Sequence, residues 1–382
     1  MSLWPFLPVD EVIEVLEWRT DVLRASAGEQ RHRLRERPRR TWILNHIFDE
    51  EQQSAARAIV RDATSFLVPD WISHIYAGPV AAGSSVSVAI ATATLGLAAG
   101  GSVVLFHSQT DYETCTIESV SPTALVLAFV AHARNVMIYR ADTAHAAVAL
   151  SISRQPGLLQ RAEITFEAPA VDVPAATAYA QYRGHDVLPV EPMVVSGSLA
   201  EGLAWPVEKF DNTTGVIATE SLRDLPDDTF TLRWHVFTAQ EIQSLREWIA
   251  SRCGRWLAFW QSTGQRDLVV AADIGAGATT LRVFSPQGVA ALGRSAFDLE
   301  IEGPAATWLR RVTAASAGPA VNGRPTFDLT IDSALGTAVA ADAFGRVSFL
   351  RCARFDADRI ELLHRPGEGL SVSVPCIEVP VP

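Results

Sequence analysis

Paired acidic residues are the side chains of this sequence best suited to acid–base or metal chemistry. Asp227 and Asp228 are adjacent, and Asp111 and Glu113 flank Tyr112. Two close carboxylates can act as general acid and base, bind a sugar, or hold Ca²⁺. No EF-hand-like series of ligands follows Asp227-Asp228, which we interpret as a turn or a loop preceding a helix. Asp111 and Glu113 are interpreted as loop residues, and no catalytic residue is predicted.

The histidines and cysteines do not form a metal-binding motif. His46 with His74 and His132 with His145 are the pairs that could meet in space, and neither has the spacing of metal ligands. The cysteines contain no CxxC pair and are interpreted as reduced, buried thiols of a protein made in a cytoplasm. They are Cys115, Cys253, Cys352 and Cys376. No metal and no cofactor is therefore predicted.

One glycine-rich segment has the composition of a phosphate-binding loop. It runs from Val269 to Thr280, contains Asp273-x-Gly275-x-Gly277, and resembles the first phosphate loop of sugar-kinase and actin-like ATPases. Those proteins also need a second Asp-x-Gly hairpin and an adenosine motif, and neither occurs here. The motifs GxxxxGK[ST], HExxH and GxSxG are absent as well. We interpret the segment as a β-turn in which glycine supplies positive φ, and we predict that the chain is not an enzyme.

Composition is typical of a folded protein and unlike that of a nucleic-acid binder. Of the 382 residues, 48% are hydrophobic and 20% are charged, which suits two domains with separate cores. A net charge of −11 argues against general nucleic-acid binding, which needs a basic surface. No apolar run is long enough to span a bilayer. The acidic residues Asp10, Glu11, Glu14 and Glu17 argue against a secretory signal.

The landmarks of the first half of the chain recur in the second half. The matches, at nearly constant offsets, are Leu7-Pro8-Val9 with Leu188-Pro189-Val190, Trp18 with Trp205, Leu23 with Phe210, Gly28 with Gly215, and Trp71 with Trp260. A duplicated scaffold repeats its buried and interface positions, whereas an enzyme confines its reactive groups to one site. We therefore predict two tandem domains, residues 1–182 with an extended N-terminal arm and residues 183–382.

The sequence of each copy predicts an extended entry, then a strand, a helix and a series of short strands. The alternating strand faces are Phe230, Leu232, Trp234 and Val236 in one copy and Trp42, Leu44, His46 and Phe48 in the other. Capping boxes start a helix after Thr238 and after Asp49. The predicted structural core of the second copy is Trp234, Trp248, Ile242, Leu245 and Ile249. Short β-prone runs complete each copy, so the fold class is mainly β (α+β), with two tandem β-sandwich or barrel domains and one packed helix in each.

Three of the ten tryptophans lie in extended segments that offer few local partners. They are Trp4, Trp18 and Trp205. Large aromatic residues anchor protein interfaces, so we predict that these three pack on a neighbouring chain. Stacking on carbohydrate is the alternative role.

Arginine is concentrated between residues 31 and 40. In an extended segment the odd-numbered residues Arg31, Arg33, Arg35, Arg37 and Arg39 would share one face. Two interpretations stay open: a solvated or partner-facing strand, and a basic strip that docks on an acidic neighbouring subunit. The matching segment of the second copy is acidic and is a candidate partner for the strip.

The segment from Glu17 to Leu23, with Gly28-Glu29-Gln30-Arg31 and Leu34-Arg35-x-x-Pro38-Arg39, resembles the opening of tail proteins from long-tailed bacteriophages. The Phe-Thr-x-x-Glu helix start and its Trp-rich exit resemble the distal-tail and tail-tip (baseplate) family too. The resemblance covers both copies and implies a tail-tube-like β-sandwich with a flanking helix. It implies a structural virion protein that forms a ring at the distal end of the tail, joins the tail tube to the central hub and fibres, and leaves a DNA channel.

The resemblance also implies partners and a location. Two copies per chain favour a trimer with pseudo-six-fold symmetry, and a hexamer with two stacked domain layers is the other arrangement. The tail tube protein would lie above the ring and hub or fibre proteins below it, with DNA only in transit and no membrane partner. The protein would be assembled in the cytoplasm of the bacterial host and reside in the virion. The alternative function is a receptor- or carbohydrate-binding module of the tail tip.

Overall fold

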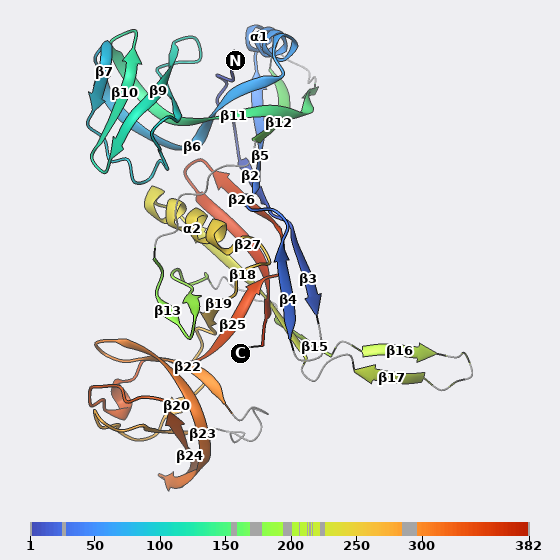
Figure 1. The fold of residues 1–382 in the computed structure, drawn as a ribbon, viewed down its shortest axis with the longest axis vertical. Helices are drawn as coiled ribbons and strands as arrows, with labels where there is room; N and C mark the ends of the chain where they lie inside the picture. The colour runs from blue at the N-terminus through green and yellow to red at the C-terminus, as the bar shows by residue number, and fades with distance from the viewer. Residues whose placement is uncertain are drawn as a thin grey trace. The chain divides into compact units, whose positions relative to one another are not determined.

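The computed structural model confirms the mainly β class, with 59% strand and 9% helix (Figure 1). The described residues are 2–24, 28–153, 159–168, 178–193, 201–205, 207–211, 213, 215, 217–221, 226–284 and 296–380. In this part of the chain, no helix is long and apolar enough to cross a membrane.

The chain divides into two compact units that interleave in sequence. Unit 1 comprises Met1–Thr177, Pro192–Leu257 and Phe355–Cys376, and unit 2 comprises Ala178–Glu191, Ala258–Arg354 and Ile377–Pro382. These units do not coincide with the predicted domains 1–182 and 183–382. The difference arises because residues 192–257 and 355–376 of the second copy belong to the compact unit that contains the first copy.

In each copy the predicted strand, helix and later strands occur in the predicted order. Further strands precede them where an extended entry was expected, and strands of 16 and 20 residues follow the first helix where short ones were expected. The first copy contains β1 (Ser2–Leu3), β2 (Val12–Glu17), β3 (Thr20–Arg24), β4 (Glu29–Arg33), β5 (Arg39–Phe48), α1 (Glu50–Asp62), β6 (Ser65–Val80), β7 (Gly83–Val88), β8 (Ser102–Phe106), β9 (Tyr112–Ser121), β10 (Ala124–Val130), β11 (Arg134–Ser153) and β12 (Gln160–Ala168). The second contains β13 (Gln181–Tyr182), β14 (His185–Val187), β15 (Glu201–Ala204), β16 (Val207–Asp211), β17 (Ile217–Ser221), β18 (Asp227–Val236), α2 (Ala239–Arg252), β19 (Phe259–Ser262), β20 (Val269–Val270), β21 (Thr280–Phe284), β22 (Phe297–Glu302), β23 (Thr307–Val321), β24 (Arg324–Ile331), a 3₁₀ turn (Ala341–Ala343), β25 (Val347–Phe355), β26 (Arg359–Arg365) and β27 (Gly369–Glu378).

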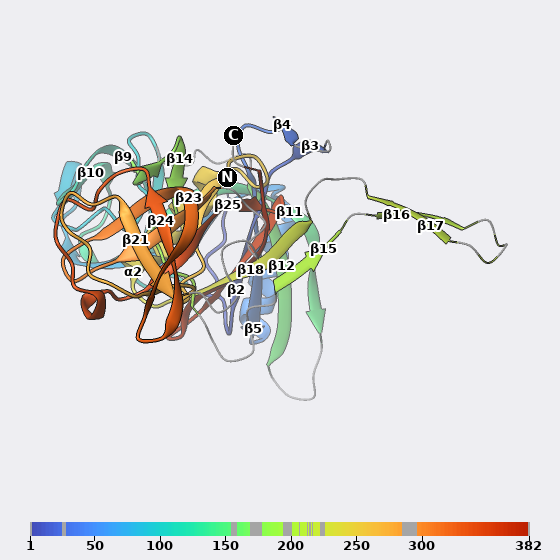
Figure 2. The same cartoon turned by 90° about the horizontal axis from the view of Figure 1, so that it is seen from below.

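Strand pairings correspond between the two copies. The order β7-β10-β9-β8-β11-β6 in the first copy has the counterpart β21-β24-β23-β22-β25-β19 in the second. A short parallel strand is added at the same place, as β1 on β6 and as β14 on β19. The hairpins β3–β4 and β16–β17 also correspond (Figure 2). The duplication in the sequence is therefore matched by a duplicated topology.

The central sheet of unit 1 contains one four-stranded block twice. Its order is β11-β12-β5-β2-β26-β27-β18-β15, in which the second half of β11 forms one edge. The strands β11, β12, β5 and β2 come from the first copy, and β26, β27, β18 and β15 are their counterparts from the second. The two blocks meet where β2 pairs antiparallel with β26.

Both helices begin at the predicted capping boxes. The Asp49 side chain accepts from the backbone N–H of Gln52, and the Thr238 side chain accepts from that of Glu241. Each third residue bonds back to the N-cap, so two otherwise unpaired donors are satisfied at each helix start. The predicted core residues Trp234, Trp248, Leu245 and Ile249 are buried, and Ile242 is half-buried. The strand faces that begin at Trp42 and Phe230 are buried as predicted.

Candidate functional site

Trp4 and Trp18 are buried within their own chain, so the prediction that they pack on a neighbouring chain is wrong. Trp4 is fully buried, lies against the rings of Phe66 and Phe166, and donates from Nε1 to His46 Nε2 at 3.2 Å. The backbone N–H of Trp18 donates to the carbonyl oxygen of Asp358 at 2.8 Å. These partners lie far along the chain, which is why the extended segments showed none of them locally.

Trp205, the third predicted interface residue, is exposed. It follows β15, and 53% of its surface is accessible. Further exposed apolar residues on β15, β16 and β17 are Leu203, Val207, Phe210 and Ile217. An exposed apolar group of this kind is a typical protein-binding surface, so Trp205 stays a candidate for contact with another chain.

The arginine-rich segment is not one strand with a single arginine face, so that prediction is wrong. β4 ends at Arg33 and β5 begins at Arg39, with an irregular segment between them. Arg31 Nη1 donates to the carbonyl oxygen of Trp256 at 2.7 Å, and the guanidinium of Arg33 lies 4.3 Å from the centroid of the Trp256 ring. The first two arginines therefore bind the second half of their own chain.

The remaining arginines of this segment face different groups. Arg35 Nη1 donates to the carbonyl oxygen of Glu17 at 2.8 Å. Arg39 lies 3.7 Å from a carboxylate oxygen of Glu167, and Arg37 is exposed. Exposed pairs such as Arg39–Glu167 contribute little to stability. The five arginines thus do not form one basic strip.

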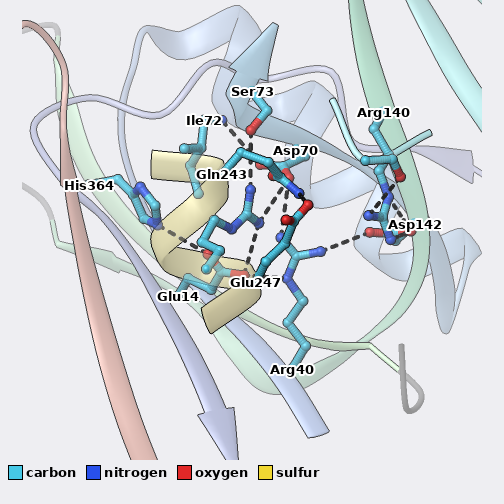
Figure 3. Close-up of polar contacts among 12 residues, drawn as sticks. Glu14, Arg40, Asp70, Ile72, Ser73, Arg140, Asp142, Gln243, Glu247 and His364 are labelled. Atoms are coloured by element: carbon cyan, nitrogen blue, oxygen red, sulfur yellow. Dashed lines mark hydrogen bonds and ion pairs between the residues drawn. The ribbon is translucent and has the colours of Figure 1, made fainter. Parts of the chain in front are cut away.

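A buried ion cluster lies where the two blocks of the unit 1 sheet meet (Figure 3). It joins Glu14 of β2, Arg40 of β5, Asp70 of β6, Arg246 of α2 and His364 of β26. Glu14 Oε1 accepts from Arg40 Nε at 2.6 Å and from Arg246 Nη2 at 2.9 Å. Asp70 Oδ2 accepts from both arginines at 3.1 Å. His364 Nε2 lies 3.0 Å from Glu14 Oε2. Four strands and a helix from distant parts of the sequence are therefore joined by these ion pairs and hydrogen bonds.

The arginines keep both carboxylates of this cluster ionised. Burial alone would raise the pKa of Glu14, yet Arg246 and Arg40 hold that pKa well below its usual value. Burial likewise acts to raise the pKa of Asp70, and the same two arginines lower it to about 2. Burial lowers the pKa of His364, against the opposing effect of its bond to Glu14. Charges this deeply buried are tolerated only when they are paired and hydrogen-bonded.

A second layer of polar groups surrounds the cluster (Figure 3). Asp142 Oδ2 accepts from Arg40 Nη1 at 3.1 Å, and Asp142 Oδ1 accepts from Arg140 Nη2 at 3.0 Å. Arg246 Nη1 donates to Ser73 Oγ at 3.1 Å. The carboxylates are therefore occupied by donors and fixed in position, which suits a structural role better than proton transfer.

His46 occupies a second buried polar site, between Trp4 and Leu7. The indole N–H of Trp4 can only donate, so His46 Nε2 is the acceptor and Nδ1 carries the proton. That Nδ1–H donates to the carbonyl oxygen of Leu7 at 3.0 Å. Burial lowers the pKa of His46 to about 4, which keeps the ring neutral and supports its interpretation as a structural histidine.

The other chemical candidates are also engaged in structural contacts. Asp227 and Asp228 begin β18, not a turn or helix-preceding loop, and pair with β15. Asp111 and Glu113 both form ion pairs with Arg134. Within the described ranges no group of three or more His, Cys, Asp or Glu could hold a metal ion.

The glycine-rich segment forms a turn, closed by the bond from Ala278 N–H to the Gly275 carbonyl oxygen at 3.0 Å. Gly275 and Gly277 do not have positive φ, so that part of the interpretation is wrong. Asp273 Oδ1 accepts from the backbone N–H of Ala341 at 2.8 Å. The aspartate thus fixes a loop of its own chain.

The thiols match their interpretation in large part. All four cysteines are free; Cys115, Cys352 and Cys376 are buried, and Cys253 is half-buried. Burial raises the pKa of Cys115 to about 12. A protonated, buried thiol is a poor nucleophile.

The ion cluster was not predicted from the sequence, although a signal for it exists. Glu14 shares the alternating face of β2 with Val12 and Leu16, and Arg40 shares that of β5 with Trp42. A charged residue in phase with a buried apolar face indicates a buried, paired charge. Its partner Arg246 lies on a helix 232 positions from Glu14, a distance that no local pattern reveals.

No protein-family model and no curated protein matches this sequence.

Proposed function

We propose that this protein is a structural component of a phage tail tip, and that its chains close into a ring that joins the tail tube to the central hub and fibres. One observation carries the proposal. The unit 1 sheet consists of two equivalent four-stranded blocks joined edge to edge by β2 and β26. A head-to-tail join between equivalent blocks can be repeated from chain to chain, and it closes into a ring when the rotation allows.

The nature of the buried polar groups supports a structural role. The carboxylates of Glu14 and Asp70 are buried and held by two arginines. A fully bonded cluster of this kind fixes the relative position of the elements that supply it. In a ring, this would hold the two copies in the geometry that each chain contributes to the circle. Three chains would supply six blocks, matching a six-fold tube above and a three-fold hub below.

Electron microscopy of the purified full chain tests this proposal. The expected particle is a ring of six similar lobes around a channel, with a mass three times the chain mass of 41.3 kDa. Mass photometry over a dilution series distinguishes this trimer from the alternative hexamer. A compact monomer without a channel at every concentration would contradict the ring. The exposed Trp205 surface would then favour the receptor- or carbohydrate-binding module, with binding to a glycan array as its test.

A further inference from the structure

The junction between the two blocks buries the residues at the end of β2. The pairing runs from Val12 opposite His364 to Glu17 opposite Arg359. Just beyond it, Trp18 is 2% exposed, and a Cβ added to Gly254 would lie 3.1 Å from the Trp18 Cβ. Asp358 Oδ2 accepts from the N–H of Thr20 at 2.7 Å. The second copy thus covers both the strand edge and the indole that follows it.

The outer edges of the same sheet are the counterparts of the two strands that meet at this junction. Among the residues that the structure describes, β15 pairs only with β18, and β11 pairs only with β12 beyond His145. β15 is the counterpart of β2, because each pairs with the strand that directly precedes the helix of its copy, β18 and β5 respectively. The second half of β11, residues 146–153, is the counterpart of β26, because each forms an antiparallel hairpin with the last strand of its copy.

Strand register identifies matching residues on the two edges. Trp42 and Phe230 begin the buried faces of β5 and β18, and Glu14 and Glu201 lie opposite them. Glu14 therefore corresponds to Glu201. Two and four residues further along each chain, Leu16 corresponds to Leu203 and Trp18 to Trp205. Leu16 and Trp18 are 6% and 2% exposed, whereas Leu203 and Trp205 are 71% and 53% exposed. The apolar groups buried at the internal junction are thus solvent-exposed at the outer edge.

The other outer edge of this sheet, residues 146–153 of β11, lies near counterparts of the residues that cover β2 at the internal junction. Leu245 and Ala56 are the matching buried residues of the two helices, so the exposed Arg57 corresponds to Arg246. Asp358 Oδ1 accepts from the N–H of Arg255, just after α2, at 3.1 Å. In the first copy, His145 Nδ1 lies 3.1 Å from the carbonyl oxygen of Thr64, just after α1. Thr64 and His145 are both exposed.

We propose that the β15 edge of one chain binds residues 146–153 of a second copy of this chain, as an antiparallel pairing that repeats the β2–β26 junction. Trp205 then packs beside Thr64 and His145 of the second copy, in the place that Trp18 holds internally. Glu201 meets Arg57 of the second copy, as Glu14 meets Arg246. This inference rests on the proposed ring and names the surface that closes it. A second copy is the occupant because this chain itself presents the counterparts of both halves of the junction.

The single lysine of the chain gives a direct test. Lys209 lies in β16, on the exposed hairpin that follows Trp205. Its counterpart hairpin, β3–β4, contacts the segment after α2 through Arg31 and Arg33, so Lys209 should lie near the end of α1 in the second copy. Zero-length coupling of amines to carboxylates in a ring of mixed ¹⁴N and ¹⁵N chains should join Lys209 to Asp62 of another chain. Links from Lys209 that reach no carboxylate of α1 in another chain would overturn the proposal.

Charge reversal provides a second, independent test. Glu201→Arg and Arg57→Glu should each reduce the assembled fraction at least tenfold, and the double variant should restore it. Glu118→Arg, at an exposed glutamate of β9 outside the proposed surface, is the matched control and should assemble normally. Thermal unfolding of each monomer confirms that the variants are folded.

Trp205→Ala should likewise prevent assembly while leaving the melting temperature of the monomer unchanged. If the wild type forms rings and the single charge reversals and Trp205→Ala also form them, this surface is wrong while the ring proposal stands. If the wild type is monomeric at every concentration, the ring proposal itself fails and the surface fails with it.

Discussion

Replacing Arg246 with Met tests whether the ion cluster holds the two blocks of unit 1 together. The substitution keeps the length of an apolar stem and removes the guanidinium that contacts Glu14 at 2.9 Å and Asp70 at 3.1 Å. Arg40 would then be the only arginine bonded to both buried carboxylates. Removing one partner of a buried ion pair costs about 3–5 kcal/mol, because the remaining charge is left without compensation.

The pKa of Asp70 gives an independent estimate of how much this ion pair contributes to the free energy of unfolding. It lies at about 2 against an ordinary 3.8, a difference that corresponds to roughly 2–3 kcal/mol. Arg40 supplies part of that stabilisation, and Arg246 also stabilises Glu14. A loss of about 3 kcal/mol in the free energy of unfolding is therefore expected for Arg246→Met at pH 7.

The measurement is urea denaturation of the full chain, followed by its total tryptophan fluorescence, to which the buried Trp248 on the same helix contributes. Arg61→Met, at an exposed arginine in the last turn of α1, is the matched control and should change stability by about 0.5 kcal/mol or less. A loss below about 1 kcal/mol for Arg246→Met would refute the view that the cluster holds α2 against the first copy.

The pH dependence of this loss adds a second criterion. In the wild type, the depressed pKa values of Glu14 and Asp70 contribute stability that is present above their unfolded pKa values and is lost as pH falls through the folded ones. Without Arg246, burial raises the pKa of Glu14, so the variant takes up a proton there at higher pH. The difference between wild type and variant should therefore shrink between pH 7 and pH 4. A constant difference across that range would mean that lost packing, rather than unpaired charge, causes the effect.

Three further substitutions test other parts of unit 1. Trp248→Ala should cost about 3–5 kcal/mol in unfolding free energy, because Trp248 is fully buried and truncation leaves a cavity; a much smaller loss in urea denaturation would contradict the assigned helix face. The wild type should lose about 3 kcal/mol between pH 7 and pH 4 through His46, whose pKa falls from 6.5 to about 4 on burial, and a pH titration of stability should show a shallower slope for His46→Gln. Gly369→Ala should destabilise by about 2–4 kcal/mol, because Gly369 has φ +86° and an added Cβ would overlap the carbonyl oxygen of Val236; unchanged thermal stability would exclude this close approach.

Local patterns predicted the elements well where the physical cause is itself local. The alternation from Phe230 to Val236 specifies β18, and the box of Thr238 with Glu241 specifies the start of α2. Both depend on residues within one strand or one helical turn. The short β-prone runs after the helices behave in the same way. Val103–His107, Ala124–Phe129 and Leu281–Phe284 end within two residues of β8, β10 and β21.

Contacts across the chain were beyond this kind of prediction. Trp18 was assigned to an interface because nothing near it in sequence covers an indole, yet its cover comes from Gly254 and Asp358. Arg31 and Arg33 were assigned to a subunit surface, yet they bind Trp256. In each case the residue type predicted that a partner exists, and only the topology decided whether the partner belongs to the same chain.

In a duplicated chain, comparing matching residues of the two copies shows whether a partner lies in the same chain or is expected in another chain. At the internal junction, a copy-one residue such as Trp18 finds its partner in copy two of the same chain, and covalent linkage guarantees the encounter. At the outer edge, Trp205 occupies the matching position without such a linkage, and it is exposed. Retaining a tryptophan there has an unfavourable solvation free energy in a monomer but a favourable one in an assembly that covers it. The contrast between a buried Trp18 and an exposed Trp205 is therefore the pattern expected if the internal junction and the contact between chains use the same surface.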